Sequence, residues 1–144
     1  MKIEEIQKMW DVECVIDPLK IKDEAISEGK LRNKYHKLLM RERYGLLSAE
    51  QALNRLKLEK FEFYTQGHTE ETREKGWKLP PIGKVLIKDV KSYVDADPDV
   101  IKQVLKIGAI REKIGYLEEI KSALMGRHWE IKNHIEMLKY LAGN

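Results

Sequence analysis

Apolar residues in the second half of the chain recur every three or four residues over a long distance. This stripe consists of Val100, Val104, Ile107, Ile110, Ile114, Leu117, Ile120 and Leu124. It follows the helix-start signal Asp97-Pro98, so the spacing predicts one face of a long helix. After Gly126, a second apolar series predicts a last helix that ends at Gly143. Two consecutive helices of this kind predict a C-terminal helical hairpin.

The first half of the chain shows the same periodicity over shorter and more polar segments. Apolar residues from Ile3 to Trp10 predict an opening amphipathic helix with Trp10 as its anchor. Asp17-Pro18 combines a helix cap with a proline at the first helical position and predicts a second helix. Ser48 and Gln51 have capping-box spacing and predict that a helix begins again after a bend at Gly45. The two long helices either fold back as a hairpin or continue as one kinked rod.

The stretch from residue 67 to 83 has no apolar periodicity. It collects glycines, paired prolines and unpatterned charges, which predicts a loop or linker that divides the protein in two. Residues 85–87 are compatible with a short strand, but the spacing of 87, 90 and 94 favours a brief helix. The predicted parts are an N-terminal helical part (1–67), a linker (68–83) and a C-terminal helical part (84–144).

The composition supports an all-α fold. The chain of 144 residues is 42% hydrophobic and 35% charged, and it has only 9 glycines and 4 prolines. This balance favours helices with wide polar faces over a sheet protein that needs frequent turns. We therefore expect an all-α protein: long N-terminal helices with a basic and aromatic face, a mid-chain loop, and a C-terminal helical hairpin that oligomerises.

Positive charge is concentrated in one region, although the formal net charge is only +3. Between residues 30 and 60 the acids are Glu42, Glu50 and Glu59 alone. The basic residues of this region are Lys30, Arg32, Lys34, Lys37, Arg41, Arg43, Arg55, Lys57 and Lys60. Cationic groups neutralise phosphates and aromatic rings stack on unpaired bases, so this region is the candidate surface for single-stranded nucleic acid.

The candidate DNA-binding residues are Arg41, Arg43, Arg55, Lys57, Lys60, Phe63, Tyr64 and His68. The alternative for these residues is a solvated, charged helix face with an aromatic core at its end. A further alternative for the whole chain is a helical adaptor whose basic rod binds an acidic protein surface without a nucleic-acid role. A helix-turn-helix regulator is disfavoured because its short turn and compact recognition helix are missing.

The C-terminal stripe is wider than one partner helix needs, because Ile101, Leu105 and small glycines extend it. Small helical modules with this surplus commonly form homo-oligomers, although the N-terminal helices of a monomeric bundle would also cover it. The candidate oligomerisation residues are Val104, Ile107, Ile110, Ile114, Leu117, Trp129, Ile135 and Leu138.

No catalytic or metal-binding motif stands out. The four histidines lack zinc-hydrolase spacing, and Cys14 is the only cysteine, so we expect no structural zinc site and no cofactor. Phosphate-binding glycine loops and serine-nucleophile motifs are also missing, which indicates a non-enzyme. The lone cysteine and the lack of a long apolar run predict a cytoplasmic protein with no membrane partner.

Several landmarks, taken in order, are similar to one family. The first segment carries Val15-Ile16-Asp17 with Lys20, Glu24 and Ala25. A basic, acidic, aromatic and glycine series follows at Lys60, Glu62, Tyr64 and Gly67. Further on come Ala96-Asp97 with Asp99-Val100, and finally Arg127, Trp129, Ile131-Lys132 and Ala142-Gly143. This order resembles the UvsY recombination mediators of T-even-type bacteriophages, and the resemblance is weakest between residues 67 and 83.

The resemblance implies a phage-encoded protein in the host cytoplasm that assembles through its C-terminal helices into a ring of six or seven subunits. It also implies non-specific binding of single-stranded DNA, loosening of the single-strand-binding protein, and help for a RecA-like phage recombinase in forming its filament. Lys60 matches a family position that is important for strand binding. Leu58 departs from the family at another such position, and neighbouring Lys57 points about 100° away around the helix.

Overall fold

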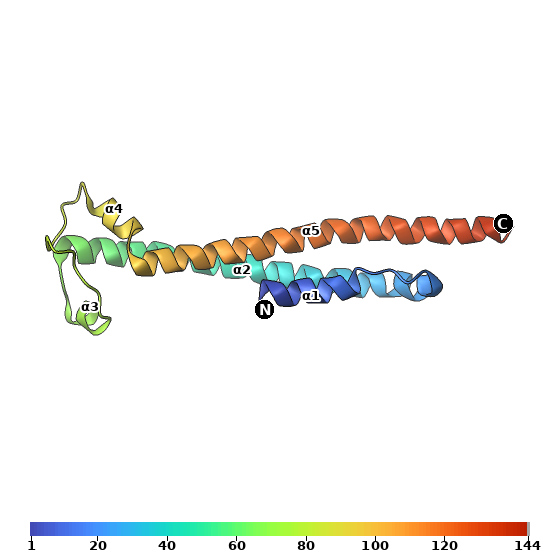
Figure 1. Cartoon of the computed structure of the whole chain (residues 1–144), viewed down its shortest axis with the longest axis horizontal. Helices are drawn as coiled ribbons and strands as arrows, with labels where there is room; N and C mark the ends of the chain where they lie inside the picture. Colours follow the sequence, from blue (N-terminus) through green and yellow to red (C-terminus); the bar gives the residue numbers. More distant parts are fainter. Residues whose placement is uncertain (144) are drawn as a thin grey trace. The chain divides into compact units, whose positions relative to one another are not determined.

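A computed structural model of the chain describes residues 1–143, and it confirms the all-α prediction: these residues contain helices, turns and loops but no strand. Figure 1 shows the elements along the chain. They are α1 (Ile3–Glu13), the short 3-10 turn η1 (Pro18–Lys20), α2 (Ile21–Gln66), α3 (Glu70–Glu74), α4 (Val90–Asp95) and α5 (Pro98–Leu141).

The helices form two compact units, and both long helices contribute to each of them. Unit 1 contains residues 1–44 and 111–144, and unit 2 contains residues 45–110. This division differs from the predicted parts 1–67, 68–83 and 84–144, because segments from opposite ends of the sequence pair with each other. In unit 1 the start of α2 runs antiparallel to the end of α5, and in unit 2 the end of α2 runs antiparallel to the start of α5.

Both long helices continue through the glycines that were predicted to interrupt them. Of the two alternatives for the N-terminal helices, the structure has the continuous one: α2 is one helix of 46 residues, so the hairpin alternative and a separate helix start at Ser48 are wrong. The predicted break at Gly126 is also wrong, since α5 is one helix of 44 residues. The C-terminal hairpin therefore does not exist. A glycine in the middle of a helix lowers helix stability by roughly 1 kcal/mol relative to alanine. The row of packed side chains between α2 and α5, here called the seam, outweighs this cost.

That seam is visible in the burial pattern. The buried and half-buried positions of α5 recur every three or four residues, as in a coiled coil. They include Val100, Gln103, Ile107, Ile110, Ile114, Leu117, Ile120, Leu124, Arg127 and Ile131. Because the three- and four-residue spacing continues past Gly126, one continuous helix keeps these side chains on the side that its own unit covers.

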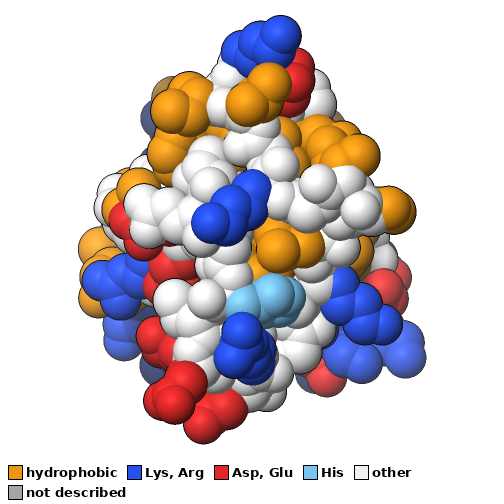
Figure 2. Space-filling model, turned by 90° about the vertical axis from the view of Figure 1, so that its left-hand side faces the viewer, with side chains coloured by type: hydrophobic (Ala, Val, Ile, Leu, Met, Phe, Trp, Pro, Cys, Tyr) orange, Lys and Arg blue, Asp and Glu red, His pale blue; other side chains and the backbone are white. Residues whose placement is uncertain are grey.

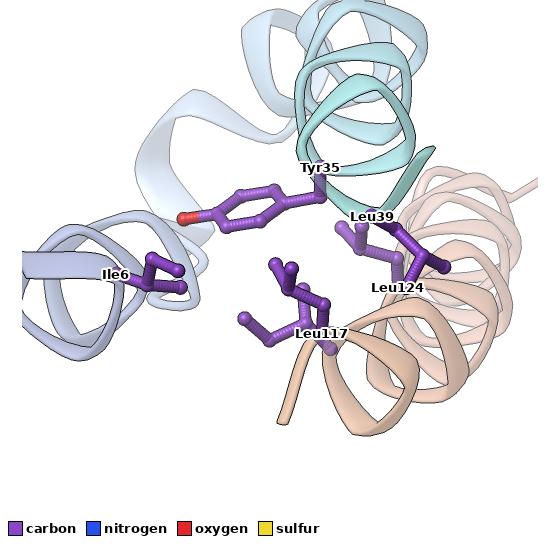
Figure 3. Packing of buried hydrophobic residues seen from close by; sticks show 6 residues of the cluster. Ile6, Tyr35, Leu39, Leu117 and Leu124 are labelled. Atoms are coloured by element: carbon purple, nitrogen blue, oxygen red, sulfur yellow. The ribbon is translucent and has the colours of Figure 1, made fainter. Parts of the chain in front are cut away.

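The core of unit 1 is formed by α1, α2 and α5 (Figure 3). Its fully buried residues are Ile6, Tyr35, Leu39, Leu117, Ile120 and Leu124. The predicted opening helix and the predicted start at Asp17-Pro18 are both confirmed. Ile6, at 1% exposure, is the anchor of α1, whereas the predicted anchor Trp10 is half-buried and meets Tyr35 edge to face, with ring centroids 5.4 Å apart.

Arg127 fixes the connection between α1 and α2 in unit 1. Its guanidinium is buried and donates to the backbone carbonyl oxygens of Glu13 and Cys14, both at 2.9 Å. The same side chain forms an ion pair with Glu24 near the start of α2. Carbonyl groups at a helix C-terminus lack partners within the helix, so one side chain satisfies the end of α1 and holds it against the long helices.

The core of unit 2 lies between the end of α2, the start of α5 and the segment that connects them. Its buried residues are Phe63, Tyr64, Val85, Val90, Val94 and Val100. Trp77 and Leu79 from residues 67–83 pack against this core, so the segment predicted as a dividing linker is part of one unit. The favoured brief helix exists as α4, but it begins at Val90, and residues 85–87 are neither helix nor strand. In residues 1–143 no helix is long and apolar enough to cross a membrane.

Replacing Arg127 tests its role in unit 1. Arg127→Ala removes three backbone hydrogen bonds and leaves Glu24 without its buried partner, so we expect the free energy of unfolding to fall by about 3 kcal/mol in urea titrations. Lys132→Ala, which removes an exposed side chain on the same helix, is the control and should be nearly neutral. Equal stability of the two variants would contradict the assignment.

Candidate nucleic-acid interface

A basic groove lies between α1 and α2 in unit 1. Its volume is about 370 Å³, and it is lined by Lys30, Lys34, Lys37 and Arg41 with Met1, Met9, Asn33 and Leu38. The four cations are spaced by four, three and four residues, which places them along one face of α2. Lys34 pairs with Glu13 of α1, whereas Lys37 and Arg41 form no ion pair within residues 1–143.

This arrangement suits a polyanion. The groove is lined by cations and neutral side chains, and within residues 1–143 the one carboxylate paired with a lining cation is Glu13, which holds Lys34. The side chains of Lys30, Lys37 and Arg41 are exposed and keep their conformational freedom. Only Arg41 of this groove was among the predicted DNA-binding residues. The signal for the others was present, because the basic series recurs at helical spacing along the same rod.

Four further residues of the predicted DNA-binding set lie in different places. Arg43 of unit 1 pairs with Glu118 at 3.1 Å. In unit 2, Arg55 lines a groove of mixed polar and apolar character with Gln51, Leu58 and Gln103. Lys57 is half-buried and 4.0 Å from Asp95. His68 is exposed and packs its ring edge to face on Phe63, with centroids 5.0 Å apart.

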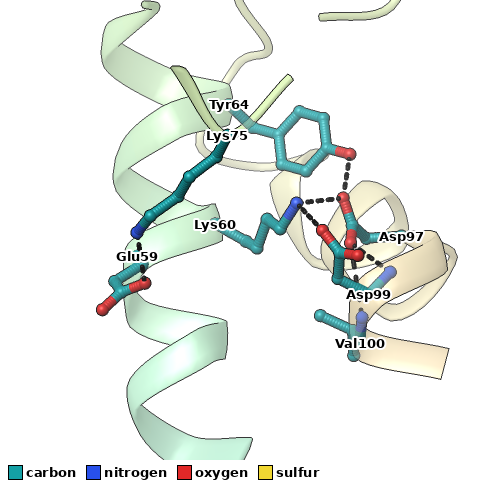
Figure 4. A network of polar contacts seen from close by, with 7 residues as sticks. All are labelled: Glu59, Lys60, Tyr64, Lys75, Asp97, Asp99 and Val100. Carbon is teal, nitrogen blue, oxygen red and sulfur yellow. Dashed lines mark hydrogen bonds and ion pairs between the residues drawn. The ribbon is translucent and has the colours of Figure 1, made fainter. Parts of the chain in front are cut away.

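Lys60 is not available to a DNA strand in this structure. The residue is 2% exposed, and its ammonium lies 3.1 Å from Asp97 Oδ2 and 2.9 Å from Asp99 Oδ2 (Figure 4). The same ammonium sits 3.7 Å from the centroid of the Trp77 ring. Direct phosphate contact by Lys60 is therefore contradicted by its burial, since two carboxylates and an aromatic face already surround the charge.

Phe63 and Tyr64 are also internal. Phe63 is 2% exposed and meets Trp77 edge to face with ring centroids 5.4 Å apart, while Tyr64 donates its hydroxyl to Asp97 Oδ2 at 2.6 Å. Neither ring offers a free face to a base, so the predicted stacking role conflicts with the structure. The sequence contained a signal for this burial. Lys60 follows Leu56 by four residues, and Phe63 and Tyr64 follow Lys60 by three and four, which are the intervals that mark the covered face of α2.

Asp97 joins these groups and also starts α5. Its Oδ1 accepts from the backbone N–H of Asp99 at 2.9 Å and of Val100 at 3.3 Å, which is a helix cap. Burial by itself would raise the pKa of the Asp97 carboxyl, but hydrogen bonds from Tyr64 and Lys60 outweigh it and hold the pKa below its ordinary value. The Tyr64 pKa is raised, first by burial and then by its hydrogen bond to Asp97.

The predicted oligomerisation residues divide into two groups. Ile107 and Leu117 are 4% and 1% exposed, and Leu117 belongs to the core of unit 1, so the prediction that they face other subunits is contradicted. Ile110, Ile114 and Ile135 are half-buried. Val104, Trp129 and Leu138 are 47%, 56% and 46% exposed and remain accessible. α2 covers part of the stripe because the two long helices pair within the chain.

The residues described hold no cluster of three or more histidine, cysteine, aspartate or glutamate side chains suited to a metal ion. The polar features of these residues include the basic groove, the buried Arg127 and Lys60 networks and separate exposed cations. These features define an all-helical protein with a phosphate-compatible surface.

Comparison with known proteins identifies the family. Residues 9–144 match the family model described as "Recombination, repair and ssDNA binding protein UvsY", and the chain belongs to this family. No curated protein matches the chain significantly.

Solved structures show the same fold. Three crystal structures of the bacteriophage T4 recombination mediator protein UvsY superpose with TM-scores of 0.78, 0.79 and 0.78 at 18%, 17% and 20% identity. The matches cover 97%, 94% and 99% of this chain, and 98% of the T4 protein in each case. At this level of identity the likeness shows the fold alone.

The pH dependence of stability tests the Asp97 network. Because the folded pKa of Asp97 is below its ordinary value of 3.8, its stabilisation is complete above about pH 5 and is lost progressively as the pH falls through 3.8 toward the lower folded pKa. Asp97→Asn should lower the free energy of unfolding by about 3 kcal/mol at neutral pH, because Lys60 loses a buried partner. Urea titrations of both proteins should converge as the pH falls below 4. A constant difference at every pH would contradict this role.

Proposed function

We propose that this protein is a recombination mediator that binds single-stranded DNA without sequence preference as a homo-oligomeric ring. In this role it destabilises the single-strand-binding protein on DNA and promotes loading of a RecA-like phage recombinase. Membership of the UvsY family over residues 9–144 carries the proposal. The basic groove of unit 1 supports it with a physical site for the strand.

In the proposed mechanism, Lys30, Lys34, Lys37 and Arg41 contact the phosphate backbone. Such contacts release condensed counterions and carry no base information, so binding is independent of sequence and falls steeply with salt. Arg43, Arg55 and His68, which are exposed, and Lys57, which is half-buried, are further candidates for contact with the strand. Lys60, Phe63 and Tyr64 act indirectly by holding unit 2 together.

Oligomerisation multiplies these weak contacts. Once one subunit holds a strand, the next subunit meets it at a high effective concentration, so a ring binds long strands far more tightly than one subunit does. A wrapped strand competes with the protein that coats single-stranded DNA, and the mediator needs no nucleotide hydrolysis for this exchange. The resemblance in sequence leads us to expect a hexamer or heptamer.

An apolar groove in unit 1 supports self-association. It has a volume of about 560 Å³ and is lined by Ile21, Lys22, Ala25, Ile26, Ile135, Leu138, Lys139 and Ala142. Nearby large side chains of α5 are also exposed, among them Met137, Tyr140 and Leu141 at 61%, 81% and 73%. Apolar surface of this extent is typical of a protein interface. We propose that it is buried between subunits, in place of Ile107 and Leu117.

Charge reversal in the groove tests the DNA interface. Lys37→Glu/Arg41→Glu should reduce affinity for oligo-dT by about tenfold or more and flatten its salt dependence, because two phosphate contacts are lost. Lys102→Glu/Lys106→Glu changes the same charge on exposed positions of α5 in unit 2 and is the matched control. Fluorescence anisotropy at several salt concentrations measures both effects. Equal losses in the two pairs would mean that only net charge matters.

Charge placed in the apolar groove tests the assembly. Ile26→Asp/Leu138→Asp should lower the particle mass measured by light scattering after size exclusion, because an unpaired carboxylate in a buried interface is costly. Helical content should stay unchanged, since both residues are exposed within the chain, at 73% and 46%. Val12→Asp/Val15→Asp, outside that groove, is the control. An unchanged mass for the first pair would place the interface elsewhere.

A further inference from the structure

Unit 2 exposes large aliphatic side chains that its own fold does not use. Ile82, Leu86 and Ile87 are 70%, 65% and 74% exposed. Val85 between them is 4% exposed, and its backbone N–H donates to the carbonyl oxygen of Tyr64 at 2.8 Å. The buried valine fixes the backbone, so the exposed aliphatic groups are presented from an ordered segment.

Two tight turns place these residues outward. The N–H of Gly83 donates to the Pro80 carbonyl at 2.8 Å, and the N–H of Asp89 donates to the Leu86 carbonyl at 2.9 Å. Ile82 and Ile87 therefore occupy central positions of the two turns. Such positions normally hold Gly, Pro, Asn, Asp or Ser, because these residues favour turn geometry and tolerate water. Turn formation does not explain the two isoleucines.

Basic residues flank these aliphatic groups along the chain. Lys78, Lys84, Lys88 and Lys91 lie in the same segment, whose one acidic residue is Asp89. All four lysines are exposed, and none forms an ion pair within residues 1–143. Figure 2 looks onto the end of the molecule that belongs to unit 2 and shows hydrophobic patches with both basic and acidic groups among them. We call Lys78, Ile82, Lys84, Leu86, Ile87 and Lys88 the tip surface.

The chemistry of the tip surface favours a protein partner over a nucleic acid. Bases stack on aromatic rings, but the exposed apolar groups here are aliphatic, and the rings of Phe63 and Tyr64 are buried. Aliphatic patches rimmed by charge are typical of protein interaction sites, and lysines at the rim select acidic partners. We propose that the tip surface docks an acidic segment of a partner protein that carries aliphatic side chains. This inference is separate from the DNA-binding role of unit 1.

A peptide-binding experiment tests the proposal. The probe is a fluorescent peptide in which pairs of Asp alternate with Leu, measured by anisotropy at low salt with the full-length chain. The first comparison peptide replaces Asp by Asn, and the second replaces Leu by Ser. We expect the Asp/Leu peptide to bind and both comparison peptides to bind at least tenfold more weakly, since charge and apolar contact are both needed.

The variant Ile82→Ser/Ile87→Ser places the binding site. This variant keeps every charge but loses two aliphatic side chains, so its affinity for the Asp/Leu peptide should fall about tenfold. Its affinity for oligo-dT should stay unchanged. Val12→Ser/Val15→Ser, which alters exposed aliphatic residues of unit 1, should leave peptide binding unchanged. Both altered positions of each pair are exposed, so the helical content measured by circular dichroism should be unchanged.

Three results would overturn the inference. The first is that the Asp/Leu peptide does not bind the wild-type chain, or that it binds the Ile82→Ser/Ile87→Ser variant as tightly as the wild-type chain. The second is loss of oligo-dT affinity in that variant, which would assign the tip surface to DNA. The third is a lower particle mass in that variant, which would assign it to a second copy of the chain. Failure of the wild-type chain to bind oligo-dT would instead contradict the proposed function and leave the tip surface intact.

Discussion

A lysine buried between two carboxylates is the interaction on which unit 2 depends. Lys60 comes from α2, whereas Asp97 and Asp99 stand at the start of α5, so the ion pairs join the two long helices directly. A buried charge without a partner costs several kcal/mol, and this requirement fixes the register of the helices. Tyr64 and the α5 backbone use the remaining acceptors of Asp97, and Trp77 covers the ammonium.

This constraint separates structural charge from functional charge. Lys60 is surrounded and cannot exchange its carboxylates for phosphates without exposing them, whereas Lys37 and Arg41 on the same helix are solvated and unpaired within residues 1–143. A phosphate that meets Lys37 or Arg41 displaces only water and counterions, whereas one that meets Lys34 competes with Glu13. The proposed division of labour therefore gives strand binding to unit 1, internal support to the Lys60 network, and partner contact to the tip surface.

Part of this architecture could be predicted from sequence, and the reasons are physical. The starts at Asp17-Pro18 and Asp97-Pro98 are local signals, since a carboxylate caps the amides that directly follow it. The apolar stripe from Val100 to Leu124 correctly predicted a long helix there, because helical periodicity is a local property of the sequence. The helix boundaries predicted at Ser48 and Gly126 were wrong because their signals are weak. A capping pair stabilises a helix start, and a glycine destabilises a helix interior, by only roughly 1 kcal/mol, and the packing between the two long helices outweighs both effects.

The candidate site was harder to predict for a related reason. A lysine beside aromatic residues has the same sequence pattern whether it faces solvent or a buried carboxylate, and the partners Asp97 and Asp99 lie more than thirty residues away from Lys60. The oligomerisation prediction had the same weakness, because the sequence does not say that α2 of the same chain covers Ile107 and Leu117. Long-range pairing decides both cases, and only the structure supplies it.

Lysine acetylation footprinting with and without oligo-dT tests the central claim most directly. The account predicts that Lys30 and Lys37 react in the free protein and become protected when the strand binds, while Lys60 stays unreactive in both states. The contradictory result would be a Lys60 that reacts readily in the free protein and is protected by DNA, with no change at Lys30 and Lys37. That outcome would mean that the strand binds at the end of α2 around Lys60.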